Sequence, residues 1–274
     1  MKDKILSIQS RIIYGYVGGN IADFAVQLHG LDVISFPTVL FATHTGHPPV
    51  YGKATTKENF DELVAGIKNL DVLDTTAGII TGYMGSEEVL RSSYEFIKQI
   101  KEKYPDVLYV FDPVMGDVDR GFYVPNTVVE ILISNLLPLC DIMTPNFFEL
   151  EHILGGKIRT VADIKNLLKA NNIIKDKILV ATSCYLEDTP AGSIETIIIR
   201  GDSVERVQSQ RINIESTGTG DLFTSMLAAQ MVNGKDITTA VKHTSDTISQ
   251  CLGYIVEKGL TEMNAMCILK YVKP

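Results

Sequence analysis

Residues 77–113, AGIITGYMGSEEVLRSSYEFIKQIKEKYPDVLYVFDP, contain two short apolar runs separated by one long amphipathic segment. Ala77–Thr81 is short and apolar, which is typical of a strand buried inside a parallel sheet. Glu87–Lys103 has apolar residues at helical spacing, and Val107–Phe111 is a second strand that continues directly into Asp112. A strand, a helix and a second strand in this order predict an α/β fold with parallel strands.

The same alternation of strands and helices extends along the rest of the chain. Further strands are predicted at Lys4–Ile8, Asp32–Thr38, Ile142–Thr144 and Lys177–Thr182. Further helices are predicted at Asn20–Gly30, Lys57–Asn69, Asn126–Asn135, Phe148–Leu154, Val161–Ala170, Asp221–Asn233, Ile237–Glu257 and Glu262–Val272. An antiparallel pair is predicted at Glu195–Arg200 and Ser203–Gln210. We therefore expect one α/β domain over residues 1–274, with a doubly wound, largely parallel central sheet and helices on both faces.

The composition excludes several classes of protein. The chain has 274 residues, 45% of them hydrophobic and 21% charged, so it can form a large core and disorder is not expected. The net charge is −8 and no basic stripe is visible, so we expect no nucleic-acid partner. No run of about 18 apolar residues and no signal-peptide pattern are found, so we expect no membrane span and a cytoplasmic location. The four cysteines lack CxxC spacing and are expected to be buried thiols.

Polar residues follow several of the predicted strands at the point where each strand ends. These residues are Ser10, Asp112, Asn146, Glu149, Thr182 and Ser183. The carboxyl ends of parallel strands meet at one edge of a sheet, and ligands bind at that edge in doubly wound folds. Together with a glycine-rich loop near the C-terminus, these polar groups indicate a nucleotide site.

Residues 215–227, ESTGTGDLFTSML, join that glycine-rich loop to a predicted helix. Gly218 and Gly220 allow positive φ and a close approach of the backbone. Successive N–H groups at the start of a helix form an anion hole. Asp221 is either a helix cap or the base that accepts a proton from an attacking hydroxyl while the loop holds a transferring phosphoryl group. The loop lacks the GxxxxGK(S/T) pattern of a Walker A motif, and no GxGxxG follows the first strand.

The loop sequence GTGDLF (218–223) resembles the anion-hole signature of the ribokinase-like superfamily. Further motifs, in family order along nearly the whole chain, resemble those of pyridoxal kinases. They are SIQSRIIYGYVGGNIA (7–22), FPTVLFATHTG (36–46), GYMGS (82–86), DPVMGD (112–117), YVP (123–125) and TPNFFELE (144–151). The resemblance implies a ribokinase-like fold and ATP-dependent phosphorylation of the 5′-hydroxyl of pyridoxal, and also of pyridoxine and pyridoxamine, in vitamin B6 salvage.

The resemblance also implies a role for each matching residue. Asp221 is the general base, and the anion hole is formed by Gly218, Thr219 and Gly220. The substrate contacts are Asp221 together with Ser10, Val17, Phe41, Thr45 and Tyr83. The ATP contacts are Asp112, Asp117, Asn146, Glu149, Thr182, Ser183, Gly218 and Thr219. Mg²⁺ accompanies ATP and is held, directly or through water, by Asp112, Asp117 and Glu149. K⁺ or another monovalent cation, and a homodimer, are implied by the resemblance alone.

Alternative interpretations remain open for several of these residues. Asn146 and Glu149 have the spacing of a capping box, which is compatible with a role at the nucleotide. Asp112 has the alternative of capping a turn. His44 either contacts the substrate or makes a structural hydrogen bond. The segment HPPVYGKATT (47–56) is a few residues longer than in many relatives and is expected at a lid or at the substrate entrance.

A sugar or nucleoside kinase is disfavoured, because such kinases usually have a longer chain with a separate sheet-like lid. Two other functions compete with pyridoxal phosphorylation. One is a hydroxymethylpyrimidine kinase of thiamin synthesis, from the same superfamily. Those relatives tend to carry a GxGG-type opening and a CGTGC-like loop, whereas here an aspartate follows the glycines. The other is a non-catalytic B6-binding regulator on the same fold, since a fold alone does not fix a function. The retained Asp221 beside an intact glycine loop argues against a regulator.

Overall fold

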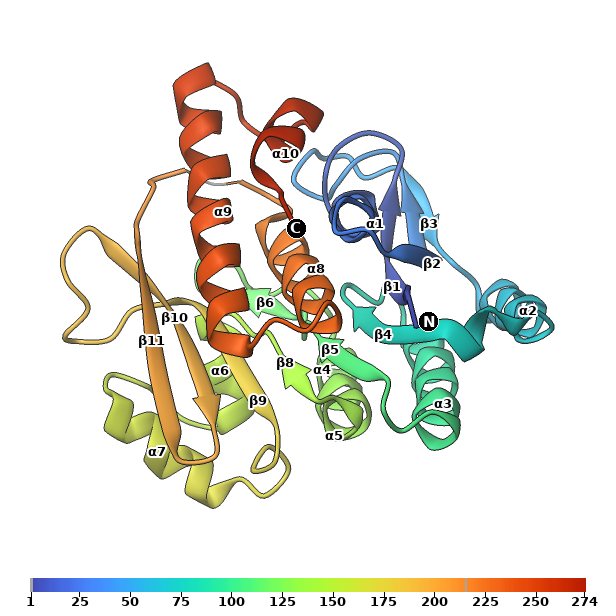
Figure 1. Cartoon of the computed structure of the whole chain (residues 1–274), viewed down its shortest axis with the longest axis horizontal. Helices are drawn as coiled ribbons and strands as arrows, with labels where there is room; N and C mark the ends of the chain where they lie inside the picture. Colours follow the sequence, from blue (N-terminus) through green and yellow to red (C-terminus); the bar gives the residue numbers. More distant parts are fainter. Residues whose placement is uncertain (1, 215) are drawn as a thin grey trace.

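The computed structural model describes residues 2–214 and 216–274, which contain a nine-stranded sheet (Figure 1). The strand order in this sheet is β11-β10-β9-β8-β5-β4-β1-β2-β3. Its strands are β1 (Lys4–Ile12), β2 (Asp32–Phe41), β3 (Gly52–Ala54), β4 (Thr76–Thr81), β5 (Leu108–Phe111), β8 (Ile142–Met143), β9 (Ile178–Cys184), β10 (Ser193–Arg200) and β11 (Ser203–Gln210). A separate antiparallel ribbon is formed by β6 (Gly116–Asp117) and β7 (Gly121–Phe122).

Helices connect most of these strands. The α-helices are α1 (Gly19–Leu28), α2 (Lys57–Lys68), α3 (Glu87–Lys103), α4 (Asn126–Ile131), α5 (Leu137–Leu139), α6 (Phe147–Leu154), α7 (Val161–Ala170), α8 (Thr219–Val232), α9 (Ile237–Lys258) and α10 (Ala265–Tyr271). A 3-10 helix, η1 (Asp71–Thr75), precedes β4, and a π-helical turn, η2 (Leu132–Leu136), connects α4 to α5.

The centre of the sheet is parallel and its two edges are antiparallel. Strands β9, β8, β5, β4, β1 and β2 pair in parallel, whereas β10, β11 and β3 run antiparallel to their neighbours. Successive side chains of a strand point to opposite faces. In β4, Ile79 therefore joins a core with Phe96 of α3, whereas Ile80 joins a second core with Val26 of α1 and Leu227 of α8. The predicted doubly wound sheet with helices on both faces is confirmed.

Helix α8 is enclosed along most of its length and holds the preceding loop in place. Residues 222–230 are all buried, and α8 lies beside both α1 and α9 (Figure 1). A helix that is apolar on all sides belongs in the interior of a domain. Because residues 222–230 are enclosed, α8 holds its first turn next to the loop that connects β1 to α1.

The observed elements differ from the predicted ones in a few places. β1 continues to Ile12 rather than ending at Ile8, because it pairs further with β2 beyond an irregularity at Gln9. The helix predicted over 126–135 is α4 followed by η2, and it continues into α5, where Pro138 has no N–H to bond the preceding turn. The strands β3, β6 and β7 are too short to produce a periodic pattern. The four cysteines are free and buried, as predicted.

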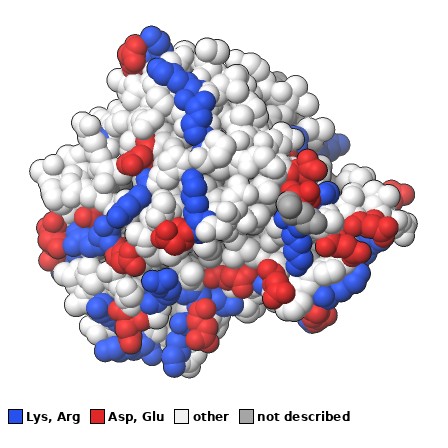
Figure 2. Space-filling view, in the orientation of Figure 1, with Lys and Arg blue, Asp and Glu red and all other residues white. Residues whose placement is uncertain are grey.

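The surface carries charges of both signs. Figure 2 shows Lys and Arg intermixed with Asp and Glu over much of the face drawn. Arg206 of β11, for example, pairs with Asp188 at 2.7 Å and with Glu195 at 2.8 Å. Among the described helices, none combines the length and the apolarity needed to cross a membrane.

Candidate active site

Strands β5, β8 and β9 are neighbours in the sheet, and polar residues follow or end each of them. Asp112 comes directly after β5, and Asn146 is the N-cap of helix α6 after β8. Asn146 forms an isolated parallel bridge with Thr182 of β9, and its Nδ2 donates to the carbonyl oxygen of Gly116 at 2.7 Å. Ser10 lies near the end of β1, two strands away from β5. These side chains therefore lie along one edge of the sheet.

The loop before α8 packs against the loop before α1 through contacts that only glycine allows. Gly218 is the N-cap of α8 with φ of 83°, and a Cβ atom there would lie 2.1 Å from the carbonyl oxygen of Tyr16. Gly18 has φ of 52°, and a Cβ atom there would lie 2.1 Å from Ser10 Oγ. Both the backbone conformation and the close approach therefore require glycine at these two positions.

The carboxylate of Asp221 is bound by a residue that the sequence analysis did not single out. The backbone N–H of Gly18 donates to Asp221 Oδ2 at 2.8 Å, across 203 positions of the chain. The N-cap of α8 is Gly218, so Asp221 is not the cap of this helix. Burial raises the pKa of Asp221, and the Gly18 hydrogen bond opposes that rise only in part. The paired glycines of YGYVGGN were the only sequence signal for this contact.

Asp112 lies in a buried hydrogen-bonded chain between the sheet and α8. Its side chain accepts a hydrogen bond from Thr224 Oγ1 of α8 at 3.2 Å, and Thr224 Oγ1 lies 2.8 Å from Thr144 Oγ1. Burial holds the pKa of Asp112 well above its usual value, and the negative charges of Glu149 and Asp221 add to this rise. These contacts link Asp112 to α8, so the alternative in which Asp112 only caps a turn does not describe them.

Glu149 and Asn146 form the capping box that their spacing predicts. Asn146 Oδ1 accepts from the Glu149 N–H at 2.9 Å, and Glu149 Oε2 accepts from the Asn146 N–H at 2.9 Å. Glu149 Oε1 also accepts from the Met115 N–H at 2.9 Å, so the same carboxylate holds the loop after β5. Burial raises the pKa of Glu149 to about 7, although the hydrogen bonds from the Met115 and Asn146 N–H groups, and a longer one from the Gly116 N–H, lower it.

Asp117 and Tyr123 complete the acidic region. Asp117, in β6, is half-buried and accepts a hydrogen bond from the Arg120 N–H at 2.7 Å. Partial burial raises the pKa of Tyr123, and the charges of Glu149, Asp112, Asp117 and Asp221 raise it further. Tyr123 is therefore close enough to sense all four carboxylates. The sequence motif YVP contains it, but sequence reasoning assigned it no role.

The carboxylates do not close on a single point. Among the described residues, the one group of three metal-ligating side chains within 4.8 Å of one another lies elsewhere, at His44, His47 and Glu262. Asp112, Asp117 and Glu149 are hard oxygen ligands of the kind that Mg²⁺ prefers, and Mg²⁺ usually keeps several waters. Their spacing suits a cation held partly through water and phosphate oxygens rather than by three direct carboxylate bonds.

The predicted ATP-tail residues lie at the end of β9. The Thr182 N–H donates to the Pro145 carbonyl oxygen at 2.8 Å, which joins this strand end to the start of α6. Ser183 is exposed and has φ of 56°, the left-handed region that non-glycine residues rarely occupy. Such a backbone is maintained against a cost of about 1–3 kcal/mol and often marks a functional position.

The predicted substrate residues fall into two groups. Ser10 and Val17 belong to the segment that contacts the glycine loop, and Val17 is buried. Phe41 ends β2 and is half-buried, and burial raises the pKa of the half-buried Tyr83. Thr45 is exposed in the loop after β2. The described contacts do not connect Thr45 or Tyr83 to Asp221.

Comparison with known proteins gives one family model and relatives that are named as vitamin B6 kinases. Residues 70–264 match the family model described as phosphomethylpyrimidine kinase. The chain is 30% identical to "Pyridoxal kinase PdxY" of Leifsonia xyli subsp. xyli, over 95% of this chain and 92% of that protein. It is 32% identical to "Pyridoxine/pyridoxal/pyridoxamine kinase" of Bordetella avium, over 90% and 84%. The solved structure of pyridoxal kinase from Leishmania donovani with ADP and pyridoxine is similar with a TM-score of 0.83 and 28% identity, over 94% and 88%.

Replacing Gly218 with alanine is expected to destabilise the fold more than the same change at the other end of α8. Gly234 has a similar φ of 86°, but no atom lies within 4 Å of a Cβ placed there. Gly234→Ala should therefore cost only the left-handed backbone, about 1–2 kcal/mol. Gly218→Ala should cost about 1–3 kcal/mol more, because the Tyr16 carbonyl must move. Urea unfolding followed by circular dichroism measures both, and equal losses would show that the loops are not tightly packed.

Proposed function

The chain belongs to the pyridoxal kinase family, and from this premise we propose that it transfers a phosphoryl group from ATP to the 5′-hydroxyl of pyridoxal, forming pyridoxal 5′-phosphate. The family makes the protein an enzyme, a kinase. The observation that carries the proposal is the half-buried Asp221 carboxylate, hydrogen-bonded to Gly18 and located in the first turn of α8. We extend the proposal to pyridoxine and pyridoxamine, for which the Bordetella relative is named.

Asp221 has the properties that a general base requires. Its raised pKa makes the carboxylate a stronger proton acceptor than an exposed aspartate. The Gly18 N–H occupies Oδ2 and orients the group. We propose that the free oxygen accepts the proton of the substrate 5′-hydroxyl, and that the hydroxyl oxygen then attacks the γ-phosphorus of ATP in line with the departing ADP.

The first turn of α8 supplies the anion hole in this proposal. The first N–H groups of a helix have no partner within the helix, and the helix dipole adds partial positive charge. Gly218, Thr219 and Gly220 are at this end, and Gly220 is exposed. We propose that these N–H groups donate to the oxygens of the transferring phosphoryl group, whose charge they stabilise most strongly in the transition state.

The acidic region suits a magnesium nucleotide. Asp112 is buried close to the charges of Glu149 and Asp221, and an unscreened group of carboxylates of this kind is stabilised by a cation. Bound Mg²⁺ would neutralise phosphate charge at this place. We propose that Asp112, Asp117 and Glu149 hold it directly or through water, with Asn146, Thr182 and Ser183 beside the ATP phosphates. A monovalent cation such as K⁺ remains part of the proposal on family resemblance.

The substrate lies on the other side of the glycine loop in this proposal. We assign the ring and its substituents to Ser10, Val17, Phe41, Thr45 and Tyr83. Phe41 and Tyr83 are half-buried aromatic side chains, which suits a flat heteroaromatic ring. Tyr83 also contacts β2, because its carbonyl oxygen accepts a hydrogen bond from Thr38 Oγ1 at 2.6 Å.

We also propose a cytoplasmic homodimer in which residues 1–274 form one domain. The continuous sheet from β1 to β11 supports a single domain. Exposed apolar side chains on and next to the β2–β3 edge, Leu40, Val50 and Tyr51, support an interface there.

Hydroxymethylpyrimidine phosphorylation is the second candidate function. It is favoured by the match of residues 70–264 to the phosphomethylpyrimidine kinase model. Purified protein with MgATP should be offered pyridoxal, pyridoxine and hydroxymethylpyrimidine in parallel, with phosphorylated product measured by mass spectrometry. We expect kcat/KM to be highest for pyridoxal. A preference for hydroxymethylpyrimidine would reverse the substrate assignment, and binding of pyridoxal without any product would favour a regulator.

Asp221→Asn is expected to lower kcat by about 10²–10⁴-fold while the fold and ADP binding are retained. Asparagine keeps an oxygen that can accept the Gly18 N–H, but it cannot take up a proton from the substrate. Steady-state kinetics and calorimetric ADP titration measure the two effects. Asp236→Asn, at the N-cap of α9, is the matched control and should keep wild-type turnover. Near-normal turnover of Asp221→Asn would assign Asp221 a structural role only.

Lowering the pH through about 7 is expected to weaken binding of Mg²⁺–ADP. Because the pKa of Glu149 is raised to about 7, this carboxyl takes up a proton in that window and loses the charge that attracts the cation. Calorimetric titrations should show a weaker pH dependence for Glu149→Gln than for the wild type. Asp163→Asn changes the capping box of α7 instead and should keep the wild-type dependence. Identical pH profiles for all three proteins would remove Glu149 from the cation site.

The raised pKa of Glu149 stabilises the nucleotide-free fold at low pH, where protonation of the same carboxyl weakens cation binding. The Glu149 carboxyl holds its proton more tightly in the folded protein than in the unfolded chain, where its pKa is near 4.5. Its contribution to the free energy of unfolding therefore falls as the pH rises from about 4.5 to about 7 and is constant above that window.

A further inference from the structure

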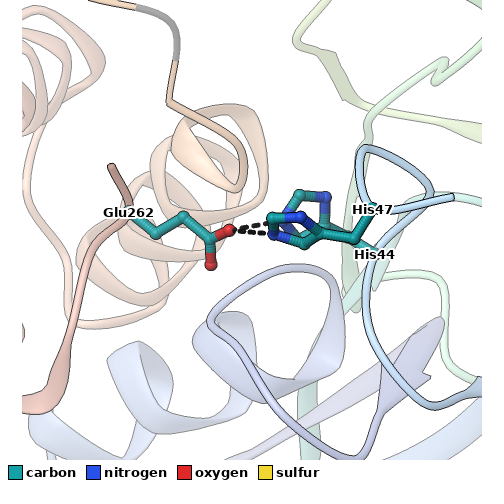
Figure 3. Close-up of side chains that lie close together, drawn as sticks. All are labelled: His44, His47 and Glu262. Atoms are coloured by element: carbon teal, nitrogen blue, oxygen red, sulfur yellow. Dashed lines mark hydrogen bonds and ion pairs between the residues drawn. The ribbon is translucent and has the colours of Figure 1, made fainter. Parts of the chain in front are cut away.

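Two histidines and a glutamate converge at a place that the proposed reaction does not use. Figure 3 shows both imidazole rings directed at the Glu262 carboxylate. His44 Nε2 lies 2.7 Å and His47 Nε2 2.6 Å from the same oxygen, Glu262 Oε1. The histidines come from the loop after β2, whereas Glu262 comes from the connection between α9 and α10. His44 therefore makes the structural hydrogen bond that was one of its two interpretations.

These three side chains are a ligand set for a transition metal. All three ligand atoms lie within 4.8 Å of one another. Two imidazoles and one carboxylate are typical ligands of zinc in sites that keep a fourth position open for water. In a tetrahedral site the ligand atoms are about 3.3 Å apart when each bond is about 2.0 Å long. The two imidazoles must therefore move slightly away from Glu262, and the His47 side chain, which is 57% exposed, has room to do so.

We propose that His44, His47 and Glu262 form a binding site for a divalent transition metal of the Zn²⁺ class. The two Nε2 atoms and Glu262 Oε1 are the ligands, with water in the fourth position. Nε2 must be deprotonated to bind the metal, so each neutral imidazole then carries its proton on Nδ1. The hydrogen bonds to Glu262 orient the Nε2 atoms of both rings toward Glu262 Oε1 before the metal binds.

Metal binding also changes the loop next to Thr45. The Gly46 N–H donates to His44 Nδ1 at 3.1 Å, so Nδ1 is an acceptor and the neutral ring carries its proton on Nε2. A metal on Nε2 moves this proton to Nδ1, and the Gly46 N–H must then turn away. Gly46 is exposed, which leaves the peptide free to rotate. The metal therefore selects a different conformation of the 44–47 loop.

The site lies at a junction of three segments. His44 Nε2 is 3.5 Å from Thr217 Oγ1, directly before the anion-hole residue Gly218. Glu262 Oε2 lies within 3.8 Å of a Cβ placed on Gly15, in the loop before α1. A metal here ties the Thr45 segment to the glycine loop and to the C-terminal helices. The effect on substrate access rests on the proposed function, whereas metal binding itself does not.

The test uses tag-free, metal-free protein without nucleotide, so that no phosphate can carry the metal. Equilibrium dialysis against Zn²⁺ measures affinity and stoichiometry, and the visible spectrum with Co²⁺ reports ligand type and geometry. We expect one metal ion per chain with nitrogen and oxygen ligands. His47→Ala and Glu262→Gln should each weaken binding by at least about 100-fold, since loss of even an outer partner of a metal ligand costs about 10–100-fold. His243→Ala, whose ring bonds Gln230 on α8, is the matched control and should bind as the wild type does.

Thermal unfolding gives a second readout that needs no catalysis. Zn²⁺ should raise the Tm of the wild type and of His243→Ala but not of the two site variants, because a ligand that binds only the folded state stabilises it. The proposal is overturned if the wild type binds no Zn²⁺, if binding survives both site variants, or if the Co²⁺ spectrum shows thiolate ligands. If the wild type binds the metal but shows no kinase activity, the proposed function is wrong and the metal site is still supported.

Discussion

The hydrogen bond between the Gly18 N–H and the Asp221 carboxylate connects the two halves of the candidate site. A hydrogen bond to a charged acceptor stabilises a fold by about 1.5–3 kcal/mol, and this one joins the first loop of the chain to the helix that runs through its interior. The bond is possible only because two glycines let the two loops pack closer together than residues with a Cβ atom would allow. The contacts of Gly218 with Tyr16, and of Gly18 with Ser10, leave no space for a Cβ atom. The proposed base, the anion hole and the substrate segment are thus positioned by one contact region.

The second constraint is electrostatic. Asp112 and Glu149 are almost fully buried, and burial raises the pKa of both. The Glu149 carboxylate can be buried because backbone N–H groups donate to both of its oxygens. The capping box of α6 is therefore part of the candidate site rather than an alternative to it. Asp112 relies on Thr224 of α8, so the acidic region and the anion hole share a helix. A cation and the phosphates of a nucleotide would offset the repulsion among these acids, which explains why such groups are tolerated together.

The His44–His47–Glu262 cluster lies next to the glycine loop and is built from the loop after β2 and the connection between α9 and α10, which are far apart in the sequence. Residues 47–56 form an exposed extension after β2, and the α9–α10 connection lies against it. Thr217 links this cluster to the glycine loop, which is proposed to hold the phosphoryl group. The structure therefore places two different kinds of ligand set near one loop: carboxylates that suit a hard cation, and imidazoles that suit a transition metal.

The sequence by itself determined the order and type of most elements, because buried strands and amphipathic helices leave periodic patterns, and its motifs predicted the residues of the candidate site. It also determined the capping box, since Asn146 and Glu149 are close in the chain. The tertiary structure alone decided that Asp221 bonds Gly18 rather than capping its own helix, that Tyr123 is near enough to the carboxylates for their charges to raise its pKa, and that Glu262 meets two histidines more than 200 positions away. Periodicity and local spacing describe interactions within a few turns of chain, whereas these contacts, and the pKa shifts that burial causes, depend on how enclosed elements such as α8 pack against distant loops.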